Sequence, residues 1–457
     1  MKPFRVRRFA LAWTVAAVAG LAVAHAQNGA AKPRRIAVFG SSVANGTGDE
    51  LAKEGYTGRL RELLGPRGWE VLNQSRGGDN TIRMAPRFAP EGTPEPNVRY
   101  LLPVNPTYVL LGLSLGNEGI RNVETRAEKD AIFDQFAKGM RGFVDRSRQN
   151  GIVPIVTLCY TRMDFTDVEY EYTRRMNLLL NSWDVPTVNF LGAIDDGTGK
   201  WARGFWLDSL HPNAAGHVEI TRTFVPSLFE ALERGKPMPK RVASDNFAHL
   251  TPGDLRITFS PADPVHPFAI GLTARAQQNG TVATISGNRL NIAIEPKKLD
   301  RGGRTTAFES ATLSTSGTFV SGVIVDQGRW AYRSADGRLI RSEVRADRSW
   351  HQILVSHYTA RGQTLLFVDG ELAGAIDERL EPTRFALGGT AGLDARDFVF
   401  YRSALNADEA AALHGGALLQ ASLEIYSPLD NVELRAGAAV ANLAQSMTTA
   451  QVQLGNH

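Results

Sequence analysis

Residues 35–46 read RIAVFGSSVANG, and they indicate how the first half of the chain folds. Four apolar residues, 36–39, end at a Gly-Ser-Ser turn, which is the pattern of a short buried strand followed by a turn. A serine directly after the first strand of an open α/β sheet lies where such folds bind ligands. Glycines beside it let the backbone turn sharply and approach a substrate. Ser42 is therefore the first candidate for a nucleophile.

The alternation of short apolar runs and amphipathic stretches continues to about residue 234. The further apolar runs are residues 69–72, 108–113, 152–159 and 185–190, and helical periods occur at 57–64, 129–148, 168–183 and 214–232. Unbroken apolar strands that alternate with helices predict a parallel sheet covered on both faces. We therefore expect a three-layer α/β domain over residues 33–236.

The second half of the chain has a different pattern. RGKPMPKRVAS at residues 234–244 predicts an interdomain linker, placed at 237–250. Short β-type segments then follow one another from 251 to 430 with almost no helical period, which predicts an all-β sandwich. The predicted strands include residues 255–259, 281–286, 290–294, 319–325, 351–357 and 365–368, and Asp369-Gly370 signals a two-residue hairpin. Residues 431–457 predict no more than a weak helix or a loose tail.

The N-terminus carries a targeting pattern. A basic start with Lys2 and Arg8 precedes an apolar stretch over residues 9–24, and Ala24-His25-Ala26 is a small-x-small cleavage site. This predicts a signal peptide over residues 1–26 and an exported protein, periplasmic or secreted. Since the apolar stretch is shorter than the ~20 residues that span a bilayer, we expect no integral membrane segment after cleavage.

Charge and cysteine content argue against a nucleic-acid-binding protein and against a disulfide-stabilised one. The 51 Lys and Arg against 47 Asp and Glu give a net charge of +4, and four of the basic residues belong to the predicted signal peptide. Without a basic stripe, nucleic-acid binding is not expected. The single cysteine, Cys159, excludes an intrachain disulfide. Because it lies in an apolar run, we expect a small buried side chain rather than a nucleophile.

Three further sequence elements supply groups that ester chemistry needs. Asp208 precedes His211 by three residues, so its carboxylate can fix the imidazole tautomer while His211 takes a proton from Ser42. Gly77-Gly78 follow the second apolar run and Gly116-Asn117-Glu118-Gly119 follow the third. A glycine amide and the asparagine amide from these two segments can both donate to one developing negative charge.

Together these blocks resemble the SGNH/GDSL hydrolases. Gly40-Ser41-Ser42-Val43, Gly78, Asn117 and Asp208-x-x-His211 occur in that family's order and approximate spacing. The resemblance implies a flavodoxin-like fold with Ser42 as nucleophile and first oxyanion amide, and with Gly78 and Asn117 as the other oxyanion donors. It also implies that His211 is the general base and that Asp208 orients it. Two departures are Ser41 in place of the family's usual Asp before the nucleophile, and Glu118 in place of the Asp after the oxyanion Asn.

Other chemistries have little support in the sequence. There is no H-E-x-x-H motif and no cysteine pair for zinc, and Gly197-Thr198-Gly199-Lys200 is followed by Trp201, which does not fit a phosphate-binding loop. We therefore expect no cofactor and no metal. His217 is the alternative base, but its place in the predicted helix 214–232 favours a packing or capping role.

The second half carries a resemblance of its own. Trp350-His351-Gln352-Ile353 with Leu365-Leu366-Phe367-Val368-Asp369-Gly370, and the segment from Tyr401 to Glu409, are similar to concanavalin A-like/laminin-G sandwiches. Such domains bind sugars, bind proteins or pack against a catalytic neighbour. Sugar binding would need an exposed aromatic platform, for which Trp330, Tyr332, Trp350 and Tyr358 are the candidates.

The predicted function is that of an exported serine esterase. An ester partner, with O-acetyl groups on a polysaccharide or oligosaccharide as the favoured substrate, follows from the attached sandwich domain. Lipid or thioester acyl hydrolysis is one alternative, and a carbohydrate-binding or adhesion protein with a vestigial hydrolase domain is another. Residues 84–99 and 163–172 follow strand ends, so we expect them to form the loops that set specificity.

Overall fold

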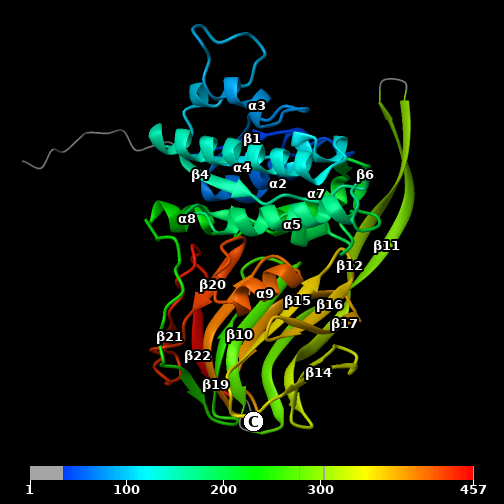
Figure 1. Cartoon of the computed structure of the whole chain (residues 1–457). Coiled ribbons are helices and arrows are strands. Elements are labelled where there is room, and N and C mark those ends of the chain that lie inside the picture. Colours follow the sequence, from blue (N-terminus) through cyan, green and yellow to red (C-terminus); the bar gives the residue numbers. More distant parts are fainter. Residues whose placement is uncertain (1–33, 277, 302–303, 456–457) are drawn as a thin grey trace, which may run out of the picture. The chain divides into compact units, whose positions relative to one another are not determined.

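A parallel sheet of five strands forms the centre of the first half of the chain (Figure 1). The computed structural model describes residues 34–276, 278–301 and 304–455, so the predicted signal peptide lies outside the described residues. The strands are β1 (Arg35–Gly40), β2 (Glu70–Asn73), β3 (Tyr108–Gly112), β4 (Val153–Thr157) and β5 (Thr187–Val188). Their order is β2-β1-β3-β4-β5, which is flavodoxin-like and confirms the predicted α/β fold.

Both faces of this sheet are covered, because successive side chains of each strand point to opposite sides. On β1, Ile36 and Val38 join one buried cluster, whereas Ala37 and Phe39 join another. The first cluster includes side chains of α2 (Gly55–Leu64), α7 (Ala214–Arg222) and α8 (Leu228–Glu233). The second includes those of α4 (Arg126–Gln149) and α5 (Asp167–Asn181). The result is the three-layer sandwich that the sequence pattern predicts.

The long helices begin at clear signals in the sequence. Thr125 and Glu128 form a capping box at the start of α4, and Thr166 and Glu169 form another at the start of α5. The predicted helix 214–232 is wrong in one respect, since the chain leaves the helix after Arg222 and begins α8 only at Leu228. Pro226 lies in this gap, and a proline cannot continue a helix because it lacks the N–H donor.

Short helices connect these elements. They are α1 (Ser42–Asn45), α3 (Thr81–Met84) and α6 (Leu191–Ile194), with the 3-10 turns η1 (Gly65–Arg67), η2 (Ala85–Phe88), η3 (Leu102–Val104), η4 (Leu115–Glu118) and η5 (Ile120–Asn122). A two-stranded hairpin of β6 (Trp206–Asp208) and β7 (His211–Pro212) follows β5 and α6.

The second half consists of two antiparallel sheets with a buried apolar cluster between them, which confirms the predicted β-sandwich class. One sheet contains β8 (Ala248–Leu250), β10 (Phe268–Ala276), β15 (His351–Tyr358), β16 (Gln363–Val368), β17 (Glu371–Asp377), β19 (Leu393–Tyr401) and β20 (Leu423–Ser427). The other contains β9 (Leu255–Phe259), β11 (Gly280–Arg301), β12 (Arg304–Asp326), β13 (Arg329–Arg333), β14 (Leu339–Arg345), β18 (Leu380–Leu387), β21 (Ala439–Val440) and β22 (Ala450–Leu454). The hairpin at Asp369-Gly370 is confirmed, with positive φ angles of 52° and 80° at its two residues.

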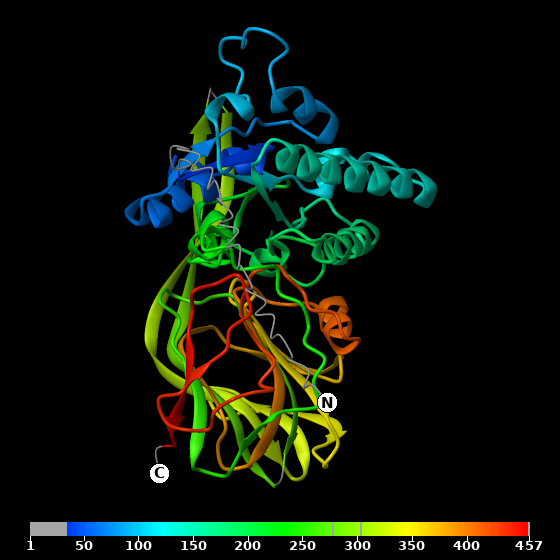
Figure 2. The same ribbon diagram turned by 90° about the vertical axis from the view of Figure 1, so that its left-hand side faces the viewer.

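One feature of the sandwich differs strongly from the sequence prediction. The segments 281–286 and 290–294 are one strand of 22 residues, β11, and it pairs with β12, which has 23 residues. The outer part of this β11–β12 arm extends beyond the sandwich beside the α/β half (Figures 1 and 2). There β12 contacts the β6 strand.

Both ends of the sandwich are also more ordered than the sequence suggests. β8 lies within the predicted linker 237–250 and pairs with β19. In the predicted tail 431–457, β22 pairs with β9, and β21 with β22, so this segment completes a sheet instead of forming a weak helix or a loose tail. The alternation of apolar and polar residues in β21 and β22 is too short to predict these strands from the sequence without their partner strand β9.

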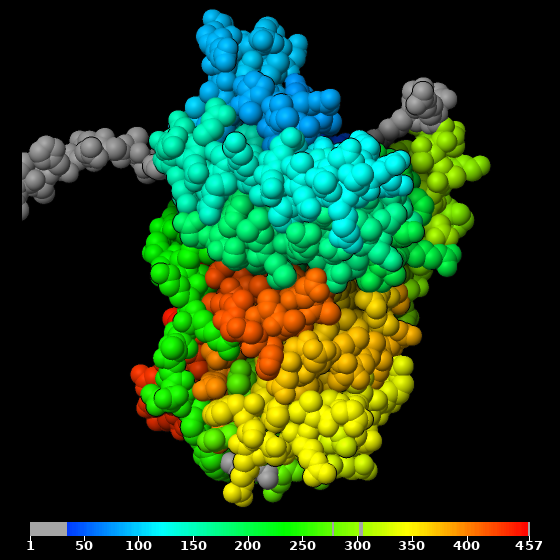
Figure 3. All heavy atoms as spheres, in the orientation of Figure 1, coloured from blue at the N-terminus to red at the C-terminus, as the bar shows by residue number. Residues whose placement is uncertain are grey.

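The two halves pack directly against each other. α9 (Ala407–His414, orange) contacts α5 (Figure 3). Across this contact Arg174 pairs with Asp408 at 3.3 Å. Buried polar pairs also cross this contact, including Asn189 Nδ2 with Glu409 Oε1 at 2.9 Å. The sandwich is therefore part of one structural unit with the α/β half.

Candidate active site

The turn that carries the candidate nucleophile is tightly packed between two strands. A β carbon at Gly40 would lie 2.2 Å from the carbonyl oxygen of Gly112 and 2.9 Å from Cβ of Ala44. The backbone N–H of Ser41 donates to that same Gly112 oxygen at 3.2 Å. Glycine at position 40 thus lets β1 end beside β3 and places Ser42 at the start of α1.

The two serines of this turn differ in access to solvent. The Ser41 side chain is 0% exposed, and its hydroxyl has no hydrogen-bond partner among the described residues. Ser42 is half-buried. Because a nucleophile has to reach its substrate, the geometry favours Ser42 over Ser41.

His211 forms a hydrogen-bonded pair with Asp208. Its Nδ1 lies 2.8 Å from Oδ1 and 3.0 Å from Oδ2 of the carboxylate, and Oδ1 also accepts the backbone N–H of Leu210 at 2.8 Å. Partial burial would raise the pKa of Asp208, but the hydrogen bond and charge of His211 outweigh it and lower the pKa. An ionised Asp208 keeps the proton on Nδ1, which leaves the lone pair of Nε2 to accept another proton.

The structure brings the segments of Ser42 and His211 together. The short helix α1 contacts β7, and a β carbon at Gly48 would lie 2.0 Å from the Pro212 oxygen and 3.0 Å from the His211 Cβ. Among the described residues no hydrogen bond joins the Ser42 hydroxyl to the His211 imidazole. Catalytic hydrogen bonds of this kind are often long until substrate binds.

The glycines after β2 lie beside the candidate nucleophile. A β carbon at Gly77 would lie 3.9 Å from Cβ of Ser42, so this loop borders the serine. Gly78 follows with φ of 82°, and no atom lies within 4 Å of the point where its β carbon would be. Its carbonyl oxygen accepts a hydrogen bond from Arg83 at 3.1 Å. The loop thus presents an open backbone next to Ser42.

Asn117 has a fixed side-chain orientation. Its Oδ1 accepts the backbone N–H of Ser114 at 2.9 Å, within a capping box at η4. Burial raises the pKa of the Tyr160 hydroxyl, while a hydrogen bond with the Asn117 side chain lowers it to a lesser extent. Since the oxygen is held by Ser114, the Nδ2 group faces the other way and is the donor that Asn117 offers.

Glu118, the departure from the family pattern after Asn117, has a structural role. Its Oε1 accepts the N–H of Thr81 at 2.6 Å and its Oε2 accepts from Gln135 at 2.9 Å. Thr81 is the first residue of α3, which follows the Gly78 loop. Glu118 therefore ties the two segments that carry Gly78 and Asn117.

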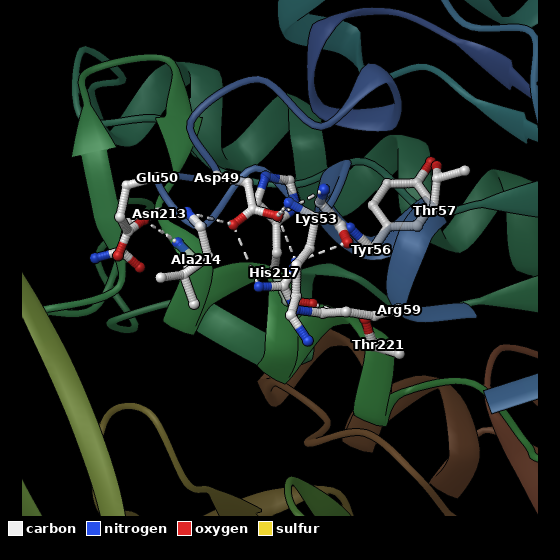
Figure 4. Close-up of polar contacts among 12 residues, drawn as sticks. Asp49, Glu50, Lys53, Tyr56, Thr57, Arg59, Asn213, Ala214, His217 and Thr221 are labelled. Atoms are coloured by element: carbon white, nitrogen blue, oxygen red, sulfur yellow. Dashed lines mark hydrogen bonds and ion pairs between the residues drawn. The ribbon is translucent and has the colours of Figure 1, made fainter. Parts of the chain in front are cut away.

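A buried polar network around Asp49 joins the loop after α1 to α2 and α7 (Figure 4). The carboxylate of Asp49 accepts the N–H groups of Lys53 and Gly55 at 3.1 and 2.9 Å and pairs with Arg59 at 2.6 Å. Burial would raise the pKa of Asp49, but Arg59 and the backbone donors lower it overall. The loop after α1 is therefore held rigidly against α2.

His217 belongs to this network rather than to the His211–Asp208 pair. Its Nδ1 accepts the N–H of Tyr56 at 3.2 Å and its Nε2 donates to the Thr47 carbonyl at 3.1 Å. Burial lowers the pKa of His217 to about 4. With both ring nitrogens occupied and the side chain 0% exposed, His217 is a packing residue.

The two loops expected to set specificity contact the segments that carry the candidate residues. Arg99, at the end of the Pro-rich insertion 84–99, donates to Asn45 Oδ1 of α1 at 2.8 Å. Met163, at the start of the loop 163–172, donates its N–H to the Ser209 carbonyl at 2.9 Å. Both loops therefore border the site.

The remaining candidates from the sequence, the Cys159 thiol and four aromatic side chains of the sandwich, are buried or half-buried. Burial raises the pKa of the Cys159 thiol to about 12, and its sulfur accepts the N–H of Leu115 at 3.3 Å. In the sandwich, Trp330, Tyr332 and Tyr358 are at most 3% exposed. Two guanidinium groups, of Arg275 and Arg396, lie 4.8 and 4.5 Å from the ring centroid of half-buried Trp350. None of the four offers a free aromatic platform.

Comparison with known proteins assigns the α/β half. Residues 38–218 match the model of the GDSL-like Lipase/Acylhydrolase family. This match supports a GDSL/SGNH hydrolase domain in the α/β half. That match supports ester hydrolase activity and spans the segments from Ser42 to His217. The sandwich lies outside it, so the likeness of the sandwich to concanavalin A-like domains stays a prediction. No curated protein matches the chain.

Solved structures similar to the GDSL-like domain include two hydrolases. One is an acetylxylan esterase from Geobacillus stearothermophilus, with 14% identity, 41% of this chain and 90% of that chain covered, and a TM-score of 0.30. Another is a GDSL-like lipase from Bacteroides thetaiotaomicron, with 13% identity, 45% and 90% coverage, and a TM-score of 0.32. At these values the likeness carries no information about the substrate.

Sequence reasoning missed several residues that support the site. Asp49 could have been noticed as a turn residue after α1, where Asp is favoured. Asn213 could have been noticed as the residue before a helix, where Asn is a favoured cap. Glu309 gave no signal in the sequence, because its partners Arg203 and Asn213, on either side of the β6–β7 hairpin, are about 100 residues away in the chain.

Proposed function

We propose that this protein is an exported serine esterase that hydrolyses carboxylic esters through an acyl-enzyme on Ser42. The observation that carries the proposal is the His211–Asp208 pair on the β6–β7 hairpin, in contact with the helix that begins at Ser42. This pair belongs to a domain of GDSL/SGNH type, which supports ester hydrolysis.

The proposed first half-reaction uses these groups in turn. Ser42 Oγ forms a bond to the ester carbonyl carbon, and His211 Nε2 takes the hydroxyl proton. The charge that develops on the carbonyl oxygen is held by the N–H groups of Ser42 and Gly78 and by Asn117 Nδ2. When the ester C–O bond breaks, the leaving alcohol takes the proton from His211, and the acyl group stays on Ser42.

The second half-reaction repeats these roles with water. His211 Nε2 accepts a proton as the water oxygen bonds to the acyl carbon, and it returns that proton to Ser42 Oγ as the acyl bond breaks. The products are a carboxylic acid and the restored enzyme, so no cofactor enters the balance.

For the substrate we propose O-acetyl esters of a polysaccharide or oligosaccharide. The α/β domain carries a sandwich that packs directly against it, and the loops 84–99 and 163–172 border the site. Lipid esters and thioesters are the competing substrates within the same chemistry.

The test is covalent labelling and hydrolysis with a matched pair of serine variants. Wild type should react with a fluorophosphonate and release acetate from 4-nitrophenyl acetate, and Ser42→Ala should do neither. Ser41→Ala should keep both activities, because the Ser41 hydroxyl is buried and has no hydrogen-bond partner among the described residues. If wild type and Ser42→Ala are equally inert, the esterase proposal is wrong and a vestigial hydrolase domain is the better account.

Substrate choice is tested on the active enzyme. Acetate release from acetylated xylan and acetylated pectin is compared with fatty-acid release from a long-chain 4-nitrophenyl ester. Faster turnover of the long-chain ester would overturn the glycan proposal and leave the esterase proposal intact.

A further inference from the structure

A short segment of the sandwich reaches the loop that carries Asp208 and His211. The segment is residues 309–311 of β12, in the outer part of the arm. The N–H of Ala311 donates to the carbonyl oxygen of Gly204 at 2.8 Å. Both carboxylate oxygens of Glu309 pair with Arg203, each at 2.8 Å. These contacts join the sandwich to the turn at Arg203 and Gly204, which leads into the catalytic hairpin.

Asn213 connects the arm to both ends of that hairpin. Its Nδ2 donates to the Gly204 carbonyl at 2.9 Å and to the Glu309 carbonyl at 3.0 Å. Its Oδ1 accepts the N–H of Gly216 at 3.0 Å, which caps helix α7. The side chain is 0% exposed. Asn213 follows His211 by two residues, so its three hydrogen bonds fix the chain directly after the imidazole.

Apolar packing holds the arm in the same place. Ala311 is 6% exposed and belongs to the buried cluster of the α/β half, and Ile292 and Ile294 of β11 pack against that cluster. A β carbon at Gly204 would lie 3.0 Å from Cβ of Ala311. The arm is thus built into the core of the hydrolase domain at this point.

The catalytic hairpin has little regular structure of its own. β6 and β7 share only the pairs Trp206 with Pro212 and Asp208 with His211, with an irregular register between them. The Asp208 side chain is 42% exposed. The position of His211 relative to Ser42 therefore depends on what the hairpin rests on, and the arm forms one of its supports.

We propose that residues 309–311 and Asn213 form a positioning element that holds His211 in line with Ser42. The sandwich is then part of the catalytic apparatus and not only a means of substrate attachment. This inference rests on the proposed function, because it assigns His211 the role of base.

The decisive variant is Asn213→Ser. A serine hydroxyl still caps α7, but it cannot replace the two Nδ2 hydrogen bonds to Gly204 and Glu309. With 4-nitrophenyl acetate we expect kcat to fall ~10–100-fold with KM within about twofold, because a small misplacement of a base costs this much. Asn213→Asp should lose at least as much, since it keeps the cap but puts a carboxylate against two carbonyl oxygens.

The matched control is Asn406→Ser. Asn406 caps α9 in the same way, with its Oδ1 accepting the N–H of Glu409 at 3.1 Å. It lies outside the hairpin network, so its loss should leave kcat at the wild-type value.

Fluorophosphonate titration separates positioning from unfolding. A positioning role predicts one labelled site per chain in Asn213→Ser with a labelling rate reduced in parallel with kcat. Wild-type kcat in Asn213→Ser, or a reduced labelled fraction with an unchanged rate for each labelled site, overturns the inference. An inert wild type would instead contradict the proposed function, so the two failures are distinct.

Discussion

His211 Nδ1 lies 2.8 Å from Asp208 Oδ1, and the same oxygen accepts the backbone N–H of Leu210. The backbone of the same hairpin therefore orients the Asp208 carboxylate, in addition to its hydrogen bond with the imidazole. The tautomer of His211 is thus set locally, by Asp208 in the same hairpin. The position of the imidazole ring depends on contacts that β12 and Asn213 make with the chain on either side of the hairpin.

Replacing Asp208 with Asn should remove the tautomer control without removing side-chain bulk. We expect kcat of Asp208→Asn on 4-nitrophenyl acetate to fall roughly 10³–10⁴-fold, because an amide can stabilise the tautomer that leaves no lone pair on Nε2. Asp184→Asn is the control, since Asp184 pairs with Arg141 and Arg148 on the surface and should leave kcat unchanged. Comparable rates for wild type and Asp208→Asn would exclude the triad.

Asn117 should have two separate roles: its Nδ2 stabilises the transition state, and its Oδ1 stabilises the local fold. Asn117→Ala should lower kcat about 10²–10³-fold through loss of the Nδ2 donor. It should also lower the free energy of unfolding by ~1 kcal/mol through loss of the cap on Ser114. Asn117→Asp keeps the oxygen that caps Ser114, so it should lose activity with a smaller loss of stability. Urea unfolding and steady-state kinetics measure the two effects; an active Asn117→Asp would exclude Asn117 as an oxyanion donor.

His217 should make stability depend on pH. Burial lowers the pKa of this side chain from 6.5 to about 4, so the unfolded chain binds its proton more readily than the folded chain. Its contribution to the free energy of unfolding is therefore fully present above pH 6.5 and is lost as the pH falls through about 4. Between pH 7 and 4, wild type should lose roughly 3 kcal/mol more than His217→Gln.

Urea unfolding at several pH values checks this dependence. His414→Gln removes an exposed histidine and should follow the wild-type curve. Parallel curves for wild type and His217→Gln would mean that His217 is not buried in its neutral form.

Cys159 should be unreactive in the folded protein. Burial raises the pKa of its thiol to about 12, and the side chain is 0% exposed. At pH 8 we expect no reaction with Ellman's reagent in native buffer and one reactive thiol per chain in urea. Rapid reaction of the native protein would place this thiol at the surface and contradict the packing around β4.

Much of the fold follows from local pattern. The strands β1 to β5 occupy the apolar runs because a strand covered on both faces needs an unbroken run of apolar residues. The order β2-β1-β3-β4-β5 then brings the ends of β1, β2 and β3 together, so the segments after these strands could be chosen as candidates from the pattern. The resemblance to the SGNH/GDSL hydrolases was needed to single out Gly78 and Asn117 within them.

The features that sequence reasoning missed depend on contacts between distant segments. The sequence predicted two strands, 281–286 and 290–294, yet the chain continues as one strand because β12 pairs with it on both sides of a register shift at Arg289/Leu290. The last strand, β22, is defined by its pairing with β9. Glu309 acts through its carbonyl oxygen, which accepts from Asn213, and through its carboxylate, which pairs with Arg203. Both partners lie about 100 residues earlier in the chain, so no local residue pattern could reveal these contacts.

The position of the arm in the chain has a consequence for biosynthesis. Arg203 and Glu309 are 106 residues apart in sequence, so the hairpin with His211 leaves the ribosome long before its support on β12 exists. Domains commonly fold from the N-terminus as the chain emerges. Here the sheet and helices of the first half can form early, whereas the segment around His211 is completed only after the arm has been made and has docked. When the chain emerges with its N-terminus first, formation of the central sheet and completion of the segment that carries His211 are therefore separate steps.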